Sequence, residues 1–270
     1  GIQAPLGMSG VRLEAKVHIV TGAITSAQNI IKSANRAGLD VCDIVLQSLA
    51  SSEAVLSAEE KALGAALIDF GGGTTDLAIF KGNSIKQTSV LALGGNNLTH
   101  DISVGLRTPV AEAEKIKIKY GSCLTDSIGK DETIEVAGVG GRKPRTLSRR
   151  ILGEILEPRV EEIFNLIHRE IYRAGMEDSI TSGVVVTGGS CLLEGVVDIA
   201  ESVFNLPTRI GKPAGIGGLV DVVNNPMYAT AVGLVLCGAG AQPKKKFRIR
   251  DSNIFDRVIA RMKKWFKDII

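Results

Sequence analysis

The alternation of apolar and polar residues predicts a three-stranded unit in the first half of the chain. Short apolar runs at 64–68 and 77–80 are typical of buried strands, and residues 84–93 predict a third strand after a short turn. The first two strands are joined by residues 69–76, a turn of three glycines flanked by Asp and Thr residues. This turn is the most distinctive stretch of the sequence.

Predicted strands and helices alternate before this unit. Residues 11–20 alternate as a half-buried strand would, and residues 26–38 predict a helix capped by Ser26. Residues 43–49 and 50–56 predict a further strand and a short helix. An alternating order of this kind is typical of an α/β fold.

The same order continues after the glycine-rich turn. Helical periodicity returns over 96–106, 110–120 and 147–174, and the last helix carries Pro158, which predicts a kink or a break. Residues 132–136 predict a strand between the second and third helices.

A second combination of strand, glycines and helix begins the last third of the chain. The apolar run 183–187 is typical of a strand buried on both faces, and residues 188–190 and a predicted helix over 192–204 follow it. Residues 207–210 predict another strand, and Pro226 begins a helix rich in Ala and Gly.

The chain ends with an amphipathic segment. Residues 241–252 are typical of a flexible linker, and residues 253–270 keep a 3.6-residue apolar period for about five turns. This pattern predicts a helix lying in a membrane interface, although a helix docked on the body or on a partner has the same pattern. Its apolar residues are Ile254, Phe255, Val258, Ile259, Met262, Trp265, Phe266 and Ile269, and its basic residues are Arg257, Arg261, Lys263, Lys264 and Lys267.

Charge strengthens the interpretation of this segment. The composition is globular, with 44% hydrophobic and 23% charged residues and a formal net charge of +3. Residues 244–270 hold ten of the 32 Lys and Arg but three of the 29 Asp and Glu, so they carry +7 and the rest of the chain −4. An anionic surface would therefore attract the end of the chain more than the body. The four cysteines lack metal-type spacing and favour free thiols in a reducing compartment.

The turn at 69–76 has the composition of a phosphate-binding loop. It contains two carboxylates, three glycines and two hydroxyls, namely Asp69, Gly71, Gly72, Gly73, Thr74, Thr75 and Asp76. Successive glycines let backbone N–H groups converge on an anion, and Asp69 could hold a phosphate-bound Mg²⁺ through water. A glycine-rich hairpin without a ligand is the alternative.

Other candidate residues are less specific on their own. Glu114 and Lys117 share a helix face, which a structural ion pair also explains. The turn Gly188-Gly189-Ser190 lets a backbone approach a nucleotide, or it is a simple tight turn. A basic cluster before the long helix is either a solvated helix entrance or a partner site, and it includes Arg142, Arg145 and Arg149.

Together these motifs resemble those of the actin-like ATPase superfamily, which includes actin, MreB, the seventy-kilodalton chaperones and the sugar kinases. Residues 69–76, residues 184–190 and the pair Glu114/Lys117 resemble its second-phosphate, adenosine and nucleoside motifs. Within the superfamily the whole chain most resembles the FtsA family of bacterial cell-division proteins. That likeness also includes the terminal helix, Met8–Arg12, Lys130–Glu132, Gly140–Arg142, Asn225-Pro226 and Tyr228–Gly233.

The resemblance implies a fold, cofactors and residue roles. The fold would be the actin-like, ribonuclease-H-like ATPase fold of the α/β class, with mixed sheets flanked by helices. The cofactors would be ATP and Mg²⁺, with Asp69 coordinating Mg²⁺ through water. Gly71 to Thr75 would hold phosphates, Glu114 and Lys117 would reach ribose and adenine, and Gly188 to Ser190 would back the purine. Asp76 would position the attacking water, and Glu53 resembles the acidic or amide residue opposite the γ-phosphate.

The resemblance also predicts how the chain divides. It implies the end of an FtsA-specific lobe at 1–40, the return segment of the first actin-like lobe at 41–66, a second core lobe at 67–108 and 182–240, a small nucleoside-side lobe at 109–181, the linker at 241–252 and the membrane-targeting helix at 253–270. The superfamily's first phosphate loop has no counterpart in the sequence, which begins at Gly1. We therefore expect a C-terminal fragment of a longer protein.

The implied function is that of an ATP-binding membrane anchor in cell division, at most a slow regulatory ATPase. It would polymerise as actin does, bind the C-terminal peptide of FtsZ through the lobe at 111–174, and attach to the cytoplasmic face of the inner membrane at the septum. Other septal membrane proteins are further candidate partners, and nucleic acid is not expected. Two alternatives remain open: a small-molecule kinase of the same superfamily, and a PilM-like protein of type IV pilus assembly.

Overall fold

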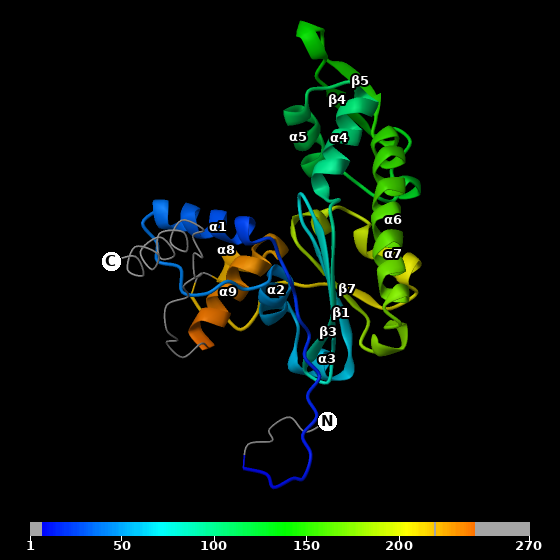
Figure 1. The fold of residues 1–270 in the computed structure, drawn as a ribbon. Helices are drawn as coiled ribbons and strands as arrows, with labels where there is room; N and C mark the ends of the chain where they lie inside the picture. Colours follow the sequence, from blue (N-terminus) through cyan, green and yellow to red (C-terminus); the bar gives the residue numbers. More distant parts are fainter. Residues whose placement is uncertain (1–6, 219, 241–270) are drawn as a thin grey trace, which may run out of the picture. The chain divides into compact units, whose positions relative to one another are not determined.

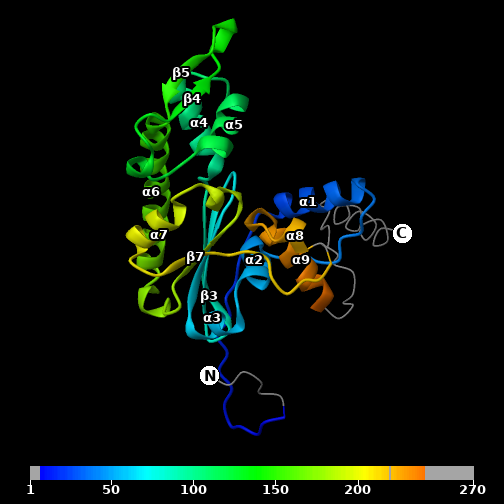
Figure 2. The same ribbon diagram turned by 180° about the vertical axis from the view of Figure 1, so that it is seen from behind.

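The computed structural model describes residues 7–218 and 220–240, which form two compact units. The larger unit holds residues 7–18 and the described residues from 45 onward, and the smaller holds residues 19–44 with the helix α1 (Ile24–Arg36). The predicted linker and amphipathic helix lie outside the described residues. Figure 1 shows the elements coloured along the chain, and Figure 2 shows them from behind.

A five-stranded mixed sheet forms the centre of the larger unit, in the order β3-β2-β1-β6-β7. Its strands are β1 (Ala65–Phe70), β2 (Thr75–Lys81), β3 (Ser84–Leu91), β6 (Val184–Thr187) and β7 (Thr208–Ile210). The first three strands are antiparallel neighbours, whereas β6 runs parallel to both β1 and β7. All five had been predicted within a few residues, and every residue of β1 is buried, as expected of a central strand.

Helices cover both faces of this sheet (Figures 1 and 2). One face packs against α6 (Arg150–Arg173) and α7 (Val196–Phe204), and the other against α2 (Gln47–Val55) and α9 (Ala229–Gly240). Successive residues of β1 point to opposite faces, so Ile68 belongs to the core under α6 and Leu67 to the core under α2 and α9. These two apolar layers position the ends of the strands.

Helix α6 passes through Pro158 as one element, so of the predicted kink or break the break is wrong. Proline removes one backbone hydrogen bond from a helix, but apolar residues on both sides of it are buried in the core, including Leu156 and Val160. Burial of this continuous face keeps the helix together. Phe164 on the same face lies between Phe70 and Phe204, with ring centroids 5.7 and 5.6 Å apart.

A smaller helical and stranded region follows β3. It contains α4 (Gly95–Leu106), α5 (Val110–Tyr120) and the antiparallel pair β4 (Thr133–Val136) and β5 (Arg145–Ser148). Both helices and β4 confirm the predictions, but β5 was missed because the predicted long helix began too early, at residue 147. The pairing with β4 holds these residues in a strand, and α6 starts only at Arg150.

Short elements complete the described chain. They are the helices α3 (Ala58–Leu63) and α8 (Val220–Val223) and the 3₁₀ turns η1 (Thr125–Ser127), η2 (Val139–Gly141), η3 (Glu177–Ser179), η4 (Gly189–Leu192) and η5 (Pro226–Tyr228). Helix α3 was not predicted, although it begins with a capping box in which Ser57 and Glu60 bond each other's backbone amides.

Two predicted strands near the start of the chain are wrong. Residues 11–20 form no strand because no strand of the described chain pairs its backbone with theirs, and apolar side chains such as Leu13 and Val17 are exposed. Residues 43–49 are not a strand either, because α2 already begins at Gln47. The first helix begins at Ile24, and Ser26 therefore lies inside it and does not cap it.

Candidate functional site

The glycine-rich turn between β1 and β2 is bound by the start of α4. The N–H of Gly71 donates to the carbonyl of Thr74 at 3.0 Å and closes the turn. The N–H groups of Gly95 and Asn96 then donate to the carbonyls of Gly71 and Gly72, at 2.9 and 2.7 Å. The carbonyl groups of Gly71, Gly72 and Thr74 thus accept hydrogen bonds within the protein.

The amide groups at the tip of the turn are available to a ligand. In the described chain the N–H groups of Gly72 and Gly73 donate no hydrogen bond, and both residues are exposed. They can therefore donate to an anion. The side chain of Thr75 cannot join them, because it is buried and its hydroxyl donates to the carbonyl of Leu93 at 2.8 Å.

Gly94, which the sequence analysis did not single out, allows this close approach. A Cβ at Gly94 would lie 2.8 Å from the carbonyl oxygens of both Gly71 and Gly72. Real side chains do not come so near a backbone oxygen, so the position requires glycine. The pair Gly94-Gly95 after a predicted strand was the available sequence signal.

Asp69 and Asp76 lie opposite each other at the adjoining ends of β1 and β2. Paired residues of neighbouring strands share a face of the sheet, so both carboxylates lie on the side that α2 and α9 cover. Burial raises the pKa of Asp76 above its ordinary value, the nearby charge of Asp69 adds to this, and the hydrogen bond from Thr74 at 2.8 Å opposes it. The predicted pair of carboxylates is therefore brought together.

Asp69 is held by α2 and α9. Its Oδ2 accepts hydrogen bonds from Ser51 at 2.7 Å, Gln47 at 3.2 Å and Thr230 at 3.2 Å. None of these three donors had been named as a candidate, because no local motif marks them and their contact depends on how the helices pack.

Glu53 does not lie beside Asp69. It is on the same helix as Gln47 but about 9 Å further along the axis, at 1.5 Å per residue. There it forms an exposed ion pair with Lys61, 2.8 Å between Oε1 and Nζ. The α2 side-chain amide that contacts Asp69 is that of Gln47, which had not been singled out from the sequence.

The second glycine turn, after β6, touches the first. Gly188 has a left-handed φ of +88°, and a Cβ there would lie 2.5 Å from the carbonyl oxygen of Phe70 and 2.6 Å from Oδ1 of Asp69. Only glycine fits such a position. Two residues later Ser190 donates from Oγ to the carbonyl of Gly71 at 2.9 Å. The two glycine turns, which were predicted separately, are thus in direct contact.

Lys117 connects α5 to the same region. It is buried, and its Nζ lies 2.8 Å from Oε2 of Glu114, 2.9 Å from the carbonyl of Gly95 and 2.8 Å from the hydroxyl of Thr99. Thr99 also donates to Glu114. Partial burial acts to raise the pKa of Glu114, but hydrogen bonds from Lys117 and Thr99 outweigh it, and the pKa lies below its ordinary value.

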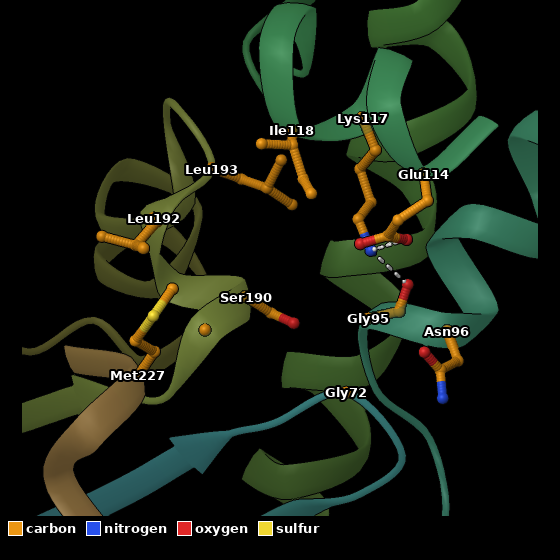
Figure 3. A pocket seen from close by; sticks show the side chains of 11 residues that line it. Gly72, Gly95, Asn96, Glu114, Lys117, Ile118, Ser190, Leu192, Leu193 and Met227 are labelled. Carbon is orange, nitrogen blue, oxygen red and sulfur yellow. Dashed lines mark hydrogen bonds and ion pairs between the residues drawn. The ribbon is translucent and has the colours of Figure 1, made fainter. Parts of the chain in front are cut away.

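A cavity of about 260 Å³ lies where these groups meet (Figure 3). Its lining consists of Gly72, Gly95, Asn96, Glu114, Lys117, Ile118, Gly189, Ser190, Leu192, Leu193 and Met227. In Figure 3 the pair Glu114 and Lys117 lies on one side and the apolar side chains of Ile118, Leu193 and Met227 lie toward the other. Polar groups at one end and an apolar wall at the other suit a small ligand that is itself part polar and part planar.

The three predicted partner arginines differ in availability. Arg149 is committed to the fold, because it forms ion pairs with Glu132 and Glu194, each at 2.7 Å, and donates from Nε to the carbonyl of Tyr120. Arg145 donates to the carbonyl of Leu106 at 2.5 Å, and Arg142 is exposed.

The described residues lack two further features. They contain no cluster of three or more His, Cys, Asp or Glu side chains arranged to hold a metal ion. None of their helices combines the length and hydropathy that crossing a membrane requires.

The sheet and the paired glycine turns define the class of protein. The chain is similar in fold to MreB5 of Spiroplasma citri bound to AMPPNP, with a TM-score of 0.62 and 21% identity over 80% of this chain and 64% of that one. It is equally similar to a chain of a PilM–PilN type IV pilus biogenesis complex, with a TM-score of 0.62 and 18% identity over 80% and 58%. The fold is therefore that of the actin-like ATPases, as the sequence predicted.

The particular family follows from sequence. The family model described as cell division protein FtsA matches residues 66–233, and the chain belongs to this family. It is 51% identical to FtsA of Pseudomonas aeruginosa, over 90% of this chain and 58% of that protein. FtsA of Neisseria meningitidis is 43% identical and FtsA of Escherichia coli 40%, each over 99% of this chain. The chain spans 58–66% of the length of these relatives.

Proposed function

We propose that the protein carrying this chain binds ATP with Mg²⁺ at the cavity between the two glycine turns, and that it serves in bacterial division as a membrane anchor for FtsZ filaments. The observation that supports the nucleotide site most strongly is the convergence of free turn amides, an acid–lysine pair and an apolar wall on one cavity. Family membership supports the role in division.

In this proposal each part of the cavity contacts a different part of ATP. The amides of Gly72 and Gly73 donate to phosphate oxygens, with the hydroxyl of Thr74 beside them. Glu114 and Lys117 bond the ribose and adenine, and the turn Gly188–Ser190 with its apolar neighbours packs on the purine. The fold relative bound to AMPPNP is consistent with this class of ligand.

The carboxylates suit a hydrated cation. Oδ1 of Asp69 accepts no hydrogen bond from the described residues, and carboxylate oxygen is the ligand that Mg²⁺ prefers. When bound, Mg²⁺ neutralises charge on the phosphates. Asp76 and Gln47, which takes the role first assigned to Glu53, orient the water that attacks the γ-phosphate. We propose that hydrolysis is slow and regulatory.

The division role needs contacts beyond the cavity. We propose that residues 253–270 lie in the anionic cytoplasmic leaflet at the septum, that the protein forms actin-like filaments with itself, and that the exposed Arg142 bonds acidic groups of the FtsZ C-terminal peptide. We also propose that the chain divides into the lobes that its resemblance to the FtsA family implies. Membership of the FtsA family favours this role over the small-molecule kinase and pilus-assembly alternatives.

Co-sedimentation tests the proposal. The full-length protein is mixed with anionic vesicles and FtsZ, with and without Mg-ATP, and compared with a variant in which the order of residues 253–270 is scrambled. We expect the wild type to bring FtsZ to the vesicles, and the scrambled variant, which keeps the charge but loses the apolar stripe, to leave both proteins in solution. If the scrambled variant sedimented with the vesicles as well as the wild type does, the anchor would be refuted.

A further inference from the structure

Helices α2 and α9 are in backbone contact beside the candidate metal carboxylate. A Cβ at Gly233 of α9 would lie 1.8 Å from the carbonyl oxygen of Ala50 in α2, so the position admits only glycine. Ser51 follows Ala50 directly, and Thr230 lies three residues before Gly233 on the same side of α9. The contact therefore brings the two hydroxyls together, with 2.9 Å between Ser51 Oγ and Thr230 Oγ1.

Both hydroxyls act on one oxygen of Asp69. Ser51 and Thr230 lie 2.7 and 3.2 Å from Oδ2, and the amide of Gln47 lies 3.2 Å from the same atom. Oδ2 therefore has donors from both helices, whereas Oδ1 accepts no hydrogen bond in the described chain. Asp69 is buried, and its Oδ1 lies beside Gly188 of the second glycine turn, where a Cβ would be only 2.6 Å from it.

We propose that Ser51 and Thr230 are positioning residues for the metal-bound nucleotide: they fix the Asp69 carboxylate through Oδ2 and leave Oδ1 for a hydrated Mg²⁺. A carboxylate free to rotate would share both oxygens among protein donors and cation, whereas the two hydroxyls assign one task to each oxygen. This inference rests on the proposed nucleotide site. It adds that the packing of α2 on α9 sets the affinity for the cation.

The geometry also explains why a single hydroxyl would not suffice. A hydroxyl has one proton to donate. If Ser51 gives its proton to Asp69, the proton of Thr230 goes to Ser51 or to Asp69, and in either case it orients the pair. Loss of the Thr230 hydroxyl therefore removes either a donor to Oδ2 or the group that orients the buried Ser51 hydroxyl.

The experiment compares nucleotide affinity with and without the metal. ATP binding to the full-length protein is measured by calorimetry in Mg²⁺ and in excess chelator, for the wild type, Ser51→Ala, Thr230→Val and Thr230→Ser. The matched control is Ser52→Ala, because Ser52 is also a buried α2 hydroxyl but donates to the carbonyl of Leu49 at 2.7 Å. Circular dichroism establishes that each variant is folded.

We expect Ser51→Ala and Thr230→Val to weaken ATP binding about tenfold or more in Mg²⁺ and to leave binding in chelator unchanged. Thr230→Ser, which keeps the hydroxyl, and the Ser52→Ala control should bind like the wild type. Equal losses with and without Mg²⁺, or unfolding of both variants, would reduce the two hydroxyls to a packing role and overturn the inference. If the wild type binds no ATP in either buffer, it is the proposed function that fails.

Discussion

Asp69 and Asp76 face each other across two strands, yet their surroundings differ. Asp69 receives three hydrogen bonds on one oxygen, whereas Asp76 receives one, from Thr74. A buried carboxylate with few donors favours its neutral form. The protein therefore stabilises the charge of Asp76 poorly, in line with its raised pKa, and this is consistent with a role next to a reacting water.

This difference gives a prediction for pH dependence. Because burial raises the pKa of Asp76, the folded state holds the proton more tightly than the unfolded state, and its ionised form lowers stability at neutral pH. Asp76→Asn should raise the free energy of unfolding at pH 7, and the gain should shrink as the pH falls through the raised pKa toward 3.8, the ordinary value. Urea denaturation at a series of pH values measures both free energies. A gain that stays constant down to pH 4 would contradict the prediction.

Local sequence predicted some of these residues and not others. The two aspartates and the glycines between them follow one another within eight positions, so their proximity is a property of one turn. Ser51 and Thr230 are separated by 179 positions and meet only because two helices pack closely. Glu53 was named by resemblance alone, and the structure places Gln47 of the same helix beside Asp69.

At the scale of elements, the turn after β6 connects the two halves of the candidate site. Its backbone fits against the end of β1 because Gly188 has no Cβ and adopts a positive φ. The next residue is different, because a Cβ at Gly189 would meet only Met227, at 4.0 Å. Two adjacent glycines therefore have separate structural requirements.

Substitution of these glycines tests that distinction. Gly188→Ala should lower the free energy of unfolding by about 2 kcal/mol or more, because the new Cβ would overlap Phe70 and Asp69 and strain the backbone. Gly189→Ala should cost less than about 1 kcal/mol. Chemical denaturation of both variants gives the comparison. Equal costs would show that the turn does not hold the close contact described.

The elements were predicted where pattern and pairing agree. Strands β1, β2 and β3 form two successive hairpins, so local turns and apolar runs suffice to predict them. The strand proposed for residues 11–20 had the right alternation but pairs with no strand in the described chain, and alternation alone does not supply hydrogen-bond partners. Strand β5 shows the reverse, since its pairing with β4 overrides a helical pattern.

At the scale of the whole molecule, the cavity is assembled from distant parts of the chain. The turn after β1, helix α5 and the turn after β6 each contribute to it, and the FtsA family match covers all three. Resemblance to a superfamily could predict this assembly because the order of its motifs is recognisable. The apolar wall of Ile118, Leu193 and Met227 was not predicted, because these residues come from separate segments without a motif.

The affinity for ATP tests the central claim most directly. In calorimetry on the full-length protein with Mg²⁺, the wild type should bind ATP, and Lys117→Ala should bind it about tenfold more weakly or worse. The reason is that the loss of Nζ removes the cation that holds Glu114 and the carbonyl of Gly95 in place at the cavity. Lys115→Ala is the matched control, since Lys115 forms an exposed ion pair with Glu112 in the same helix, and it should bind within about twofold of the wild type. A wild type that binds no ATP, or a Lys117→Ala variant that binds it as well as the control does, would contradict the account.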